Sequence, residues 1–418
     1  MGKPKILILT SVYPYLPGEY FFEDEIPYWE GTDLFDEITI MPWSAEGIPR
    51  KTSERIKIDK PLLGRPPKWV RCLYCFHRLL YPFLLKEILW LAGRKKLTLR
   101  NLRSLLACAS GSVMTYSRLK KFLKGKPGYT VYAYWNDAQA YGAALAKRAG
   151  LIDSLVARAH RFDVYENRRA GGYMPLKRCF ARYFDQIFTL SAEASDYMEN
   201  AYGIPPGILC IAPLGVPVPA LSSTPGGDCE VNIVSVSFCR PVKRLDKIID
   251  ALAVFAGRHG RLKVNWRHIG GGAGFDEAKA YARLRLSSFA NATYAFHGTI
   301  PNSDVKAFCI QNKTDLFINA SESEGIPVSI MEAMAAGVPP LAPDVGGMAD
   351  LVSDDFGVLM GDNPSVEDIA DGIEELMKKA RSPEIRRKAR ERVENRFNAA
   401  KNYPEFIERL HALAAGKR

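Results

Sequence analysis

The sequence predicts an α/β protein with two doubly wound parallel sheets, and three observations lead to this prediction. Short apolar runs alternate with amphipathic helical stretches, a pattern typical of parallel sheets covered by helices. The alternation stops at a segment rich in Pro, Gly and Ser, residues 213–228, and then begins again, as expected at a domain boundary. Of the 418 residues, 47% are hydrophobic and 25% are charged, which excludes collagen, coiled coil and wholesale disorder.

The first half contains five expected strands. Each is a short, mainly apolar run, as expected for strands that are buried on both faces. These strands cover residues 5–10, 38–41, 130–134, 154–158 and 186–190. Helices are expected at residues 138–149 and 192–201, and a loop punctuated by Pro and Gly is expected at residues 13–18.

The second half repeats this design. Strands are expected at residues 231–237, 264–269, 294–297, 315–319 and 340–342, and helices at residues 244–258, 328–336 and 402–415. We therefore expect a first domain at 1–215, a linker at 216–229, a second domain at 230–395 and a final helical segment at 396–418. Ligands usually bind at the carboxyl ends of the strands in such sheets, here in a cleft between the two halves.

The positive charge of the chain is concentrated in one segment. The net charge is +11, but residues 65–126 hold 15 Lys and Arg and one acid, Glu87, and the rest of the chain carries −3. This segment also contains many aromatic and aliphatic residues, a combination that favours an anionic membrane surface over nucleic acid. The alternative is a solvated helical face without a partner.

No membrane span, secretory signal or zinc site is expected. The best apolar stretch, residues 79–92, contains Lys86 and Glu87 and is shorter than the roughly 20 residues that a span requires. The apolar run at residues 6–9 is too short for a signal peptide. Cys72 and Cys75 have no second pair nearby, so reduced thiols in a cytoplasmic protein are the simpler interpretation.

Two glutamates near residue 330 form the most informative motif. Glu324 lies in a loop with Gly and Pro, and Glu332 lies eight residues later in the helix that follows. The backbone N–H groups of Gly325, Ile326 and Val328 lie beside the start of that helix, where unpaired donors and the helix dipole attract a phosphate. Glu332 can accept hydrogen bonds from a ribose diol, and Glu324 can accept them from a sugar. A surface helix that merely carries acids near its start is the alternative.

This stretch resembles the Glu-x7-Glu motif of retaining glycosyltransferases of the GT-B architecture, family four. Residues 344–352 also resemble the downstream loop of that family. The resemblance implies that Glu324 contacts the donor sugar and Glu332 the nucleotide ribose. It also implies a GT-B fold, in which two Rossmann-like domains face a cleft and the C-terminal helix, residues 396–418, packs back on the N-terminal domain.

The loop after the strand at 231–237 is expected to supply cations. A cation there would neutralise charge on a departing diphosphate, which is often the largest catalytic effect. Lys243 aligns with the diphosphate-binding lysine of the family. Phe238 stands where the family has a paired arginine, and Arg240 follows two residues later, so Arg240 is a candidate replacement. A surface ion pair is the alternative for Arg240.

Three further candidates lie in the first half and one in the second. His160 follows a strand and matches the position of a histidine that the family places near the reaction centre, although a lone histidine is more often structural. Gly18 belongs to a loop that resembles the N-terminal glycine loop of the family, which approaches donor phosphate or acceptor, and Glu19 stands where a second glycine is common. Gly298 lies at a strand end where relatives contact the base through the backbone.

These observations lead to one functional hypothesis and two alternatives. We expect a retaining hexosyltransferase that uses a UDP- or GDP-sugar and a lipid-linked saccharide acceptor in surface polysaccharide synthesis, at the inner face of the plasma membrane. The chain contains no Asp-x-Asp, so neither a metal nor a cofactor is expected. No nucleic-acid partner is expected. A non-transferase GT-B enzyme such as an epimerase and a non-catalytic polyanion- or nucleotide-binding protein are the alternatives.

Overall fold

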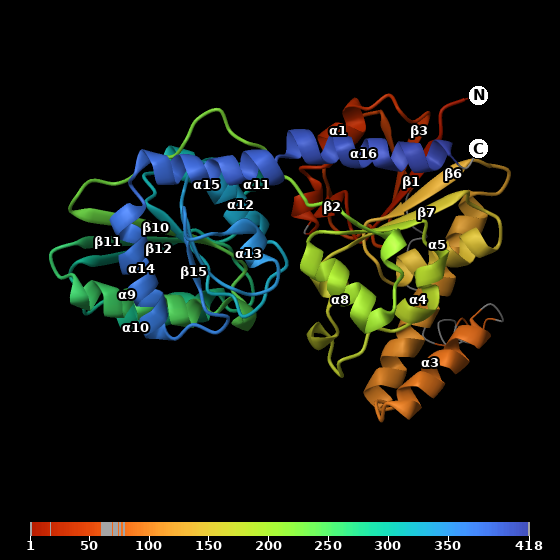
Figure 1. Ribbon diagram of the computed structural model, residues 1–418, viewed down its shortest axis with the longest axis horizontal. Coiled ribbons are helices and arrows are strands. Elements are labelled where there is room, and N and C mark those ends of the chain that lie inside the picture. Colours follow the sequence, from red (N-terminus) through yellow and green to blue (C-terminus); the bar gives the residue numbers. More distant parts are fainter. Residues whose placement is uncertain are drawn as a thin grey trace. The chain divides into compact units, whose positions relative to one another are not determined.

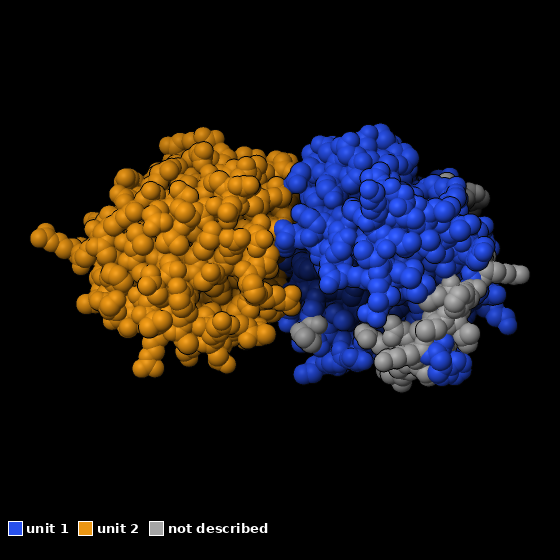
Figure 2. Space-filling model, turned by 90° about the horizontal axis from the view of Figure 1, so that it is seen from below, with its two compact units in different colours: residues 1–212, 403–418 blue, residues 213–402 orange. Residues whose placement is uncertain are grey.

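Each half of the chain is built around a parallel sheet. The computed structural model describes residues 2–16, 18–59, 69, 74, 77 and 80–416. The chain divides into two units, the first made of residues 1–212 and 403–418 and the second of residues 213–402 (Figure 2). Figure 1 shows the two sheets with helices around each.

The sheet of the first unit has seven parallel strands in the order β5-β3-β1-β6-β7-β8-β9. Its strands are β1 Lys5–Thr10, β3 Glu37–Pro42, β5 Ile56–Ile58, β6 Tyr129–Ala133, β7 Ser154–Ala159, β8 Gln186–Thr189 and β9 Leu209–Ile211. The five strands expected here are confirmed within one residue at each end. A short antiparallel pair, β2 Tyr15–Leu16 with β4 Ile48–Pro49, lies outside this sheet.

Residues on β1 show that this sheet is buried on both faces. Ile6 and Ile8 pack on one face in the same core as Trp29 and Phe406. This face is covered by α1 Ile26–Gly31 and α16 Ala399–Ala415 (Figure 1). Leu7 and Leu9 belong to the core of the opposite face. Helices that contribute to that core are α3 Tyr81–Gly93, α4 Leu99–Phe122, α5 Ala138–Arg148, α6 Arg161–Val164, α7 Lys177–Phe180 and α8 Ala192–Tyr202.

The basic segment is helical over its described part. Residues 80–126 contain α3 and α4, joined by a short turn. Residues 65–68, 70–73, 75–76 and 78–79 of the segment, including Cys72 and Cys75, lie outside the described residues. Among the helices that the structure describes, none is long and apolar enough to cross a membrane.

The sheet of the second unit has six parallel strands in the order β12-β11-β10-β13-β14-β15. Its strands are β10 Glu230–Val236, β11 Lys263–Ile269, β12 Ala292–Phe296, β13 Leu316–Ile318, β14 Pro340–Pro343 and β15 Val358–Met360. The helices of this unit are α9 Leu245–Arg258, α10 Phe275–Leu286, α11 Asn302–Gln311, α12 Val328–Ala335, α13 Met348–Leu351, α14 Val366–Lys379 and α15 Pro383–Arg396. The five expected strands are again found, each within two residues of its expected ends.

The segment expected as a linker, residues 216–229, belongs to the second unit and is hydrogen-bonded to it. The N–H of Ser223 donates to Ala336 O at 2.7 Å, and the N–H of Gly226 donates to Asp315 Oδ1 at 3.0 Å. The last helix, α16, begins at Ala399, three residues before its expected start. Its residues from Tyr403 onward belong to the first unit.

The strand orders place one switch point in each sheet. In the first unit, chain order runs from β1 outward through β3 and β5 and then resumes on the other side of β1 with β6. In the second unit, the same reversal separates β10 from β13. Ligands of doubly wound sheets bind where the loops after two such neighbouring strands diverge. A ligand-binding site is therefore expected at the carboxyl ends of β1 and β6 and of β10 and β13.

Candidate functional site

In the second unit, an ion pair joins the loops on the two sides of the switch point. Lys243 lies in the short 3-10 helix Pro241–Lys243 after β10, and its Nζ pairs with Oε1 of Glu324, which follows β13. Asn319 at the end of β13 donates from Nδ2 to the same oxygen at 3.3 Å. The Glu324 side chain is 8% exposed and that of Lys243 is 22% exposed. Two of the expected site residues are thus brought together, and Asn319 joins them.

A second set of contacts joins the loop after β10 to the loop after β13. The N–H of Glu322 donates to Val242 O at 2.9 Å. Arg244 pairs with Glu322, with 3.3 Å between Nη2 and Oε2. Sequence reasoning missed Asn319, Glu322 and Arg244. The signal for Asn319 is a polar residue directly after a buried strand, whereas the Arg244–Glu322 pair depends on strand order alone.

The loop after β14 packs closely against Glu324. Gly346 has a φ of +59°, and a Cβ at this position would lie 2.1 Å from Glu324 O. The N–H of Gly347 donates to Gly325 O at 3.0 Å. Any side chain at Gly346 would therefore displace the Glu324 loop, so this position requires glycine.

The start of α12 presents backbone donors beside this pair. Pro327 precedes the helix and contributes no N–H, and no side chain caps the helix. The N–H groups of Gly325, Ile326 and Val328 have no hydrogen-bond acceptor among the described residues. Glu332 lies on the second turn of the same helix and is half-buried. Unpaired donors at a helix start can bind an anion.

Arg240 and Gly298 lie apart from these contacts. The Arg240 side chain is exposed and lies over the ring of Phe238, 5.7 Å from its centroid. Within the described ranges, Arg240 forms no ion pair. Gly298 follows β12 with a φ of +66° and accepts a hydrogen bond from the N–H of Gly270 at 2.8 Å.

In the first unit, His160 follows β7 and lies among aromatic rings. Its ring centroid is 4.6 Å from that of Trp135, 4.9 Å from Tyr134 and 5.6 Å from Phe21. Neither ring nitrogen has a hydrogen-bond partner among the described residues. Burial and the positive charge of Arg158 hold the pKa of His160 well below its usual range. His160 is therefore neutral at pH 7 and has a free donor and a free acceptor.

A buried polar cluster supports the His160 loop. Asp163 accepts hydrogen bonds from the N–H of His160 at 2.5 Å and from that of Asn136 at 2.6 Å. Lys177 donates to Asn136 O at 3.0 Å and to its Oδ1 at 2.7 Å. Burial lowers the pKa of Lys177 to about 8 and raises that of Asp163 to about 6. Sequence reasoning missed Lys177 and Asn136, because nothing local distinguishes them from surface residues.

The loop after β1 holds the remaining two candidates, Gly18 and Glu19. Gly18 has a φ of +128°, and a Cβ there would lie 2.9 Å from Val12 Cγ2. Glu19 is buried, and its carboxylate accepts hydrogen bonds from backbone N–H groups of the same loop and from the indole of Trp135. Trp135 follows β6, so this contact bridges the β1/β6 switch point.

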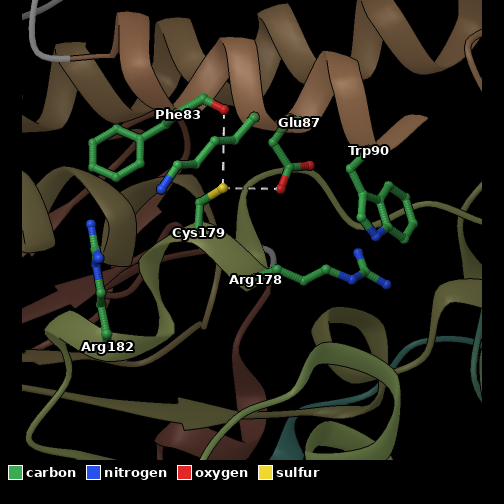
Figure 3. A pocket seen from close by; sticks show the side chains of 7 residues that line it. Phe83, Glu87, Trp90, Arg178, Cys179 and Arg182 are labelled. Carbon is green, nitrogen blue, oxygen red and sulfur yellow. Dashed lines mark hydrogen bonds between the residues drawn. The ribbon is translucent and has the colours of Figure 1, made fainter. Parts of the chain in front are cut away.

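A separate pocket of about 210 Å³ lies beneath α3. Figure 3 shows Phe83, Glu87 and Trp90 of α3 facing Arg178 and Cys179, with Arg182 at the side. The Cys179 thiol donates to Glu87 Oε1 at 3.3 Å, and the Arg178 guanidinium lies 3.9 Å from the Trp90 ring centroid. These contacts hold the buried face of α3 against α7 within the first unit.

Comparison with known proteins shows that most of the second unit is similar to a known family. Residues 228–396 match the family described as glycosyl transferases group 1. The whole chain is also similar to a Bacillus subtilis protein described as a putative teichuronic acid biosynthesis glycosyltransferase, TuaC, with 23% identity over 95% of this chain and 96% of that protein. A D-inositol 3-phosphate glycosyltransferase of Rhodococcus opacus is 24% identical over 46% of this chain and 45% of its own length.

Solved structures extend the comparison from residues 228–396 to both units of the chain. The lipopolysaccharide outer core galactosyltransferase WaaB matches 97% of this chain and 98% of its own, with a TM-score of 0.66 and 14% identity. The Anabaena protein HepE, solved with UDP and glucose, matches 97% of this chain and 99% of its own, with a TM-score of 0.67 and 17% identity. The chain therefore has the expected GT-B fold, with one Rossmann-like sheet in each unit.

Proposed function

We propose that this protein is a retaining, metal-independent hexosyltransferase that transfers a sugar from a UDP- or GDP-sugar to a lipid-linked saccharide during surface polysaccharide synthesis. The observation that carries the proposal is the Lys243–Glu324 pair beside the unpaired N–H groups that precede α12, within the residues that match glycosyl transferases group 1. A cation, a carboxylate and a helix start are the groups that a nucleotide diphosphate sugar requires.

Donor binding would exchange the partners of the ion pair. Lys243 would turn from Glu324 to the diphosphate, and Glu324 would accept hydrogen bonds from sugar hydroxyls. The N–H groups of Gly325, Ile326 and Val328 would receive a phosphate oxygen, and Glu332 the ribose hydroxyls. As the sugar–phosphate bond breaks, negative charge grows on the leaving diphosphate, and preorganised cations and N–H donors stabilise that charge most strongly. These groups would neutralise the diphosphate without a metal ion.

The names of the relatives support the proposed acceptor class. TuaC is named for teichuronic acid synthesis and WaaB for the lipopolysaccharide outer core, and HepE was solved with UDP and glucose. An anionic, membrane-embedded acceptor would also account for the basic and apolar segment at residues 65–126. We therefore propose a lipid-linked saccharide as the acceptor and attachment to the inner face of the membrane.

The outer face of α3 provides a surface for that attachment. Tyr81, Leu85 and Leu89 repeat every four residues on α3 and are 69%, 49% and 63% exposed, whereas Phe83, Glu87 and Leu91 form its buried face. The only acid among residues 80–126 is the buried Glu87, while several cations of α3, of the turn after it and of the start of α4 are exposed. These cations are Lys86, Arg94, Lys95, Arg100 and Arg103. Exposed apolar side chains and exposed cations on one segment suit the interface of an anionic bilayer.

Donor turnover tests the proposed function. The purified protein is incubated with UDP- and GDP-sugars, with and without membrane extract, and products are followed by chromatography and by the anomeric coupling in NMR spectra. We expect sugar transfer only in the presence of extract, with retention of the anomeric configuration. An epimerase would convert the donor without extract, and a binding protein would convert nothing.

Substitutions at the ion pair test whether Lys243 and Glu324 take part in sugar transfer. Lys243→Ala and Glu324→Ala are each expected to lower kcat/KM by roughly 100-fold or more, the typical effect of removing one group that stabilises the transition state. Asp371→Ala is the matched control, since Asp371 also forms an ion pair in the second unit, with Arg258, but is 66% exposed and lies outside the site loops, and we expect a change within about threefold. Full activity of both ion-pair variants would contradict the assigned site.

A further inference from the structure

The carboxylate of Glu19 occupies a concave arrangement of backbone donors at the end of β1. Its Oε1 accepts a hydrogen bond from the N–H of Ser11 at 2.9 Å. Its Oε2 accepts from the N–H of Val12 at 2.8 Å and from that of Tyr13 at 2.6 Å. Three successive N–H groups that converge on one point form an anion-binding nest. Here the anion belongs to the chain itself.

The indole of Trp135 completes the site. Trp135 Nε1 donates to Glu19 Oε1 at 2.6 Å, so each carboxylate oxygen accepts two hydrogen bonds. The residue is only 6% exposed. A buried carboxylate is tolerated when its lone pairs are satisfied in this way. The four donors match what one oxyanion, such as a phosphate, would require.

The backbone around Glu19 is shaped for this contact. Glu19 has a φ of 49° and a ψ of 40°, the left-handed region that is unfavourable for a residue other than glycine. Arg50 braces the loop by donating to Tyr15 O at 3.0 Å and to Gly18 O at 2.7 Å. The Glu19 carboxylate is therefore held in the nest by a rigid loop rather than by a flexible side chain alone.

The location links this carboxylate to the candidate site. The nest lies at the β1/β6 switch point, where doubly wound sheets bind their ligands. Trp135, which donates to Glu19, also packs against His160, with 4.6 Å between ring centroids. An external anion in the nest would lie on the same side of the sheet as His160.

We propose that Glu19 is a built-in occupant of an oxyanion site at the end of β1 and that it excludes phosphate and carboxylate groups of substrates from this position. Glu19 is thus a specificity-determining residue. The part of the substrate that meets this loop must be uncharged, such as the hydroxyl groups of a saccharide. The identity of that substrate rests on the proposed function, whereas the occupied oxyanion site does not.

Titration with inorganic phosphate tests the inference without any need for activity. Glu19→Gly empties the nest and suits the left-handed backbone, so the four donors become available to an external anion. By isothermal titration calorimetry, we expect Glu19→Gly to bind phosphate with one-to-one stoichiometry and at least ten times more tightly than the wild type. Phosphate should also change the tryptophan fluorescence of this variant through Trp135.

The matched control is Glu46→Gly, which removes one negative charge at an exposed position of the same unit. This control should bind phosphate as the wild type does. If Glu19→Gly, with circular dichroism like that of the wild type, bound phosphate no better than Glu46→Gly, the inference would be wrong. If Glu19→Gly bound phosphate but the wild type transferred no sugar, the oxyanion site would be supported and the proposed function would be contradicted.

A measurement on the wild type covers the case in which Glu19→Gly does not fold. The amides of Ser11, Val12 and Tyr13 should exchange slowly with deuterium, because they donate to a buried carboxylate. Addition of 50 mM phosphate, a concentration on the order of weak anion sites, should leave their exchange unchanged. Fast exchange, or a marked slowing by phosphate, would show that the nest is open to external anions and would overturn the inference.

Discussion

At the scale of single residues, burial determines the protonation of His268. His268 lies on β11 and is fully buried, where its Nδ1 is 2.9 Å from Ser235 Oγ and its Nε2 is 3.5 Å from Cys239 Sγ. Burial lowers the pKa of His268 to about 4. The imidazole is therefore neutral in the folded protein at pH values where it is protonated in the unfolded chain.

This difference predicts a pH dependence of stability. The folded-state pKa lies below the unfolded value of about 6.5, so the unfolded state binds more protons between these two values. The stabilisation is fully present above pH 6.5 and is lost as the pH falls toward 4, by about 3 kcal/mol. In urea unfolding followed from pH 7.5 to 4, His268→Gln should lose correspondingly less stability than the wild type. A constant difference between the two proteins across this range would contradict the assignment.

At the scale of secondary structure elements, α16 shows how a terminal helix completes a distant core. Its buried side chains include Tyr403, Phe406 and Leu410, which pack on the sheet of the first unit. Phe406 covers the buried guanidinium of Arg158, with 4.0 Å to the ring centroid, and Arg158 pairs with Glu25 at 2.7 Å. The helix therefore shields an ion pair that would otherwise be partly hydrated.

Removal of the Phe406 ring should destabilise the first unit strongly. Phe406→Ala is expected to lower the free energy of unfolding by roughly 3–5 kcal/mol, the usual cost of truncating a buried phenylalanine. Glu408→Ala, on the exposed side of the same helix, is the control and should change it by less than about 0.5 kcal/mol. Equal effects of the two substitutions in chemical denaturation would show that α16 is not packed as described.

At the scale of the whole molecule, the charge is divided between one basic segment and a nearly neutral remainder. Residues 65–126 carry +14 and the rest of the chain −3. The ion pair at the candidate site requires only local charges, so we propose that the surplus serves another surface. Its concentration in the segment that contains α3, together with the exposed apolar residues of that helix, favours an anionic bilayer as the partner.

Liposome co-sedimentation tests this partner. The wild type should bind vesicles with 30% phosphatidylglycerol more tightly than neutral vesicles, and 0.5 M NaCl should weaken that binding because salt screens exposed charges. The double variant Leu85→Asp, Leu89→Asp should bind at least ten times more weakly. Leu284→Asp is the control, since Leu284 is 73% exposed in the second unit. Equal binding to anionic and neutral vesicles would contradict the proposal.

The sequence by itself determined the two parallel sheets, the approximate ends of their expected strands, the presence of Lys243 and Glu324 in loops that follow strands, and the presence of Glu332 in the next helix. These features follow from local periodicity and from the position of polar residues after buried strands. Only the tertiary structure decided which of them meet. Lys243 and Glu324 are joined because β10 and β13 are neighbours, and Trp135 reaches the Glu19 carboxylate because β1 lies beside β6. Strand order is set by packing across the whole sheet, so pairings between residues far apart in the chain leave no local pattern to read.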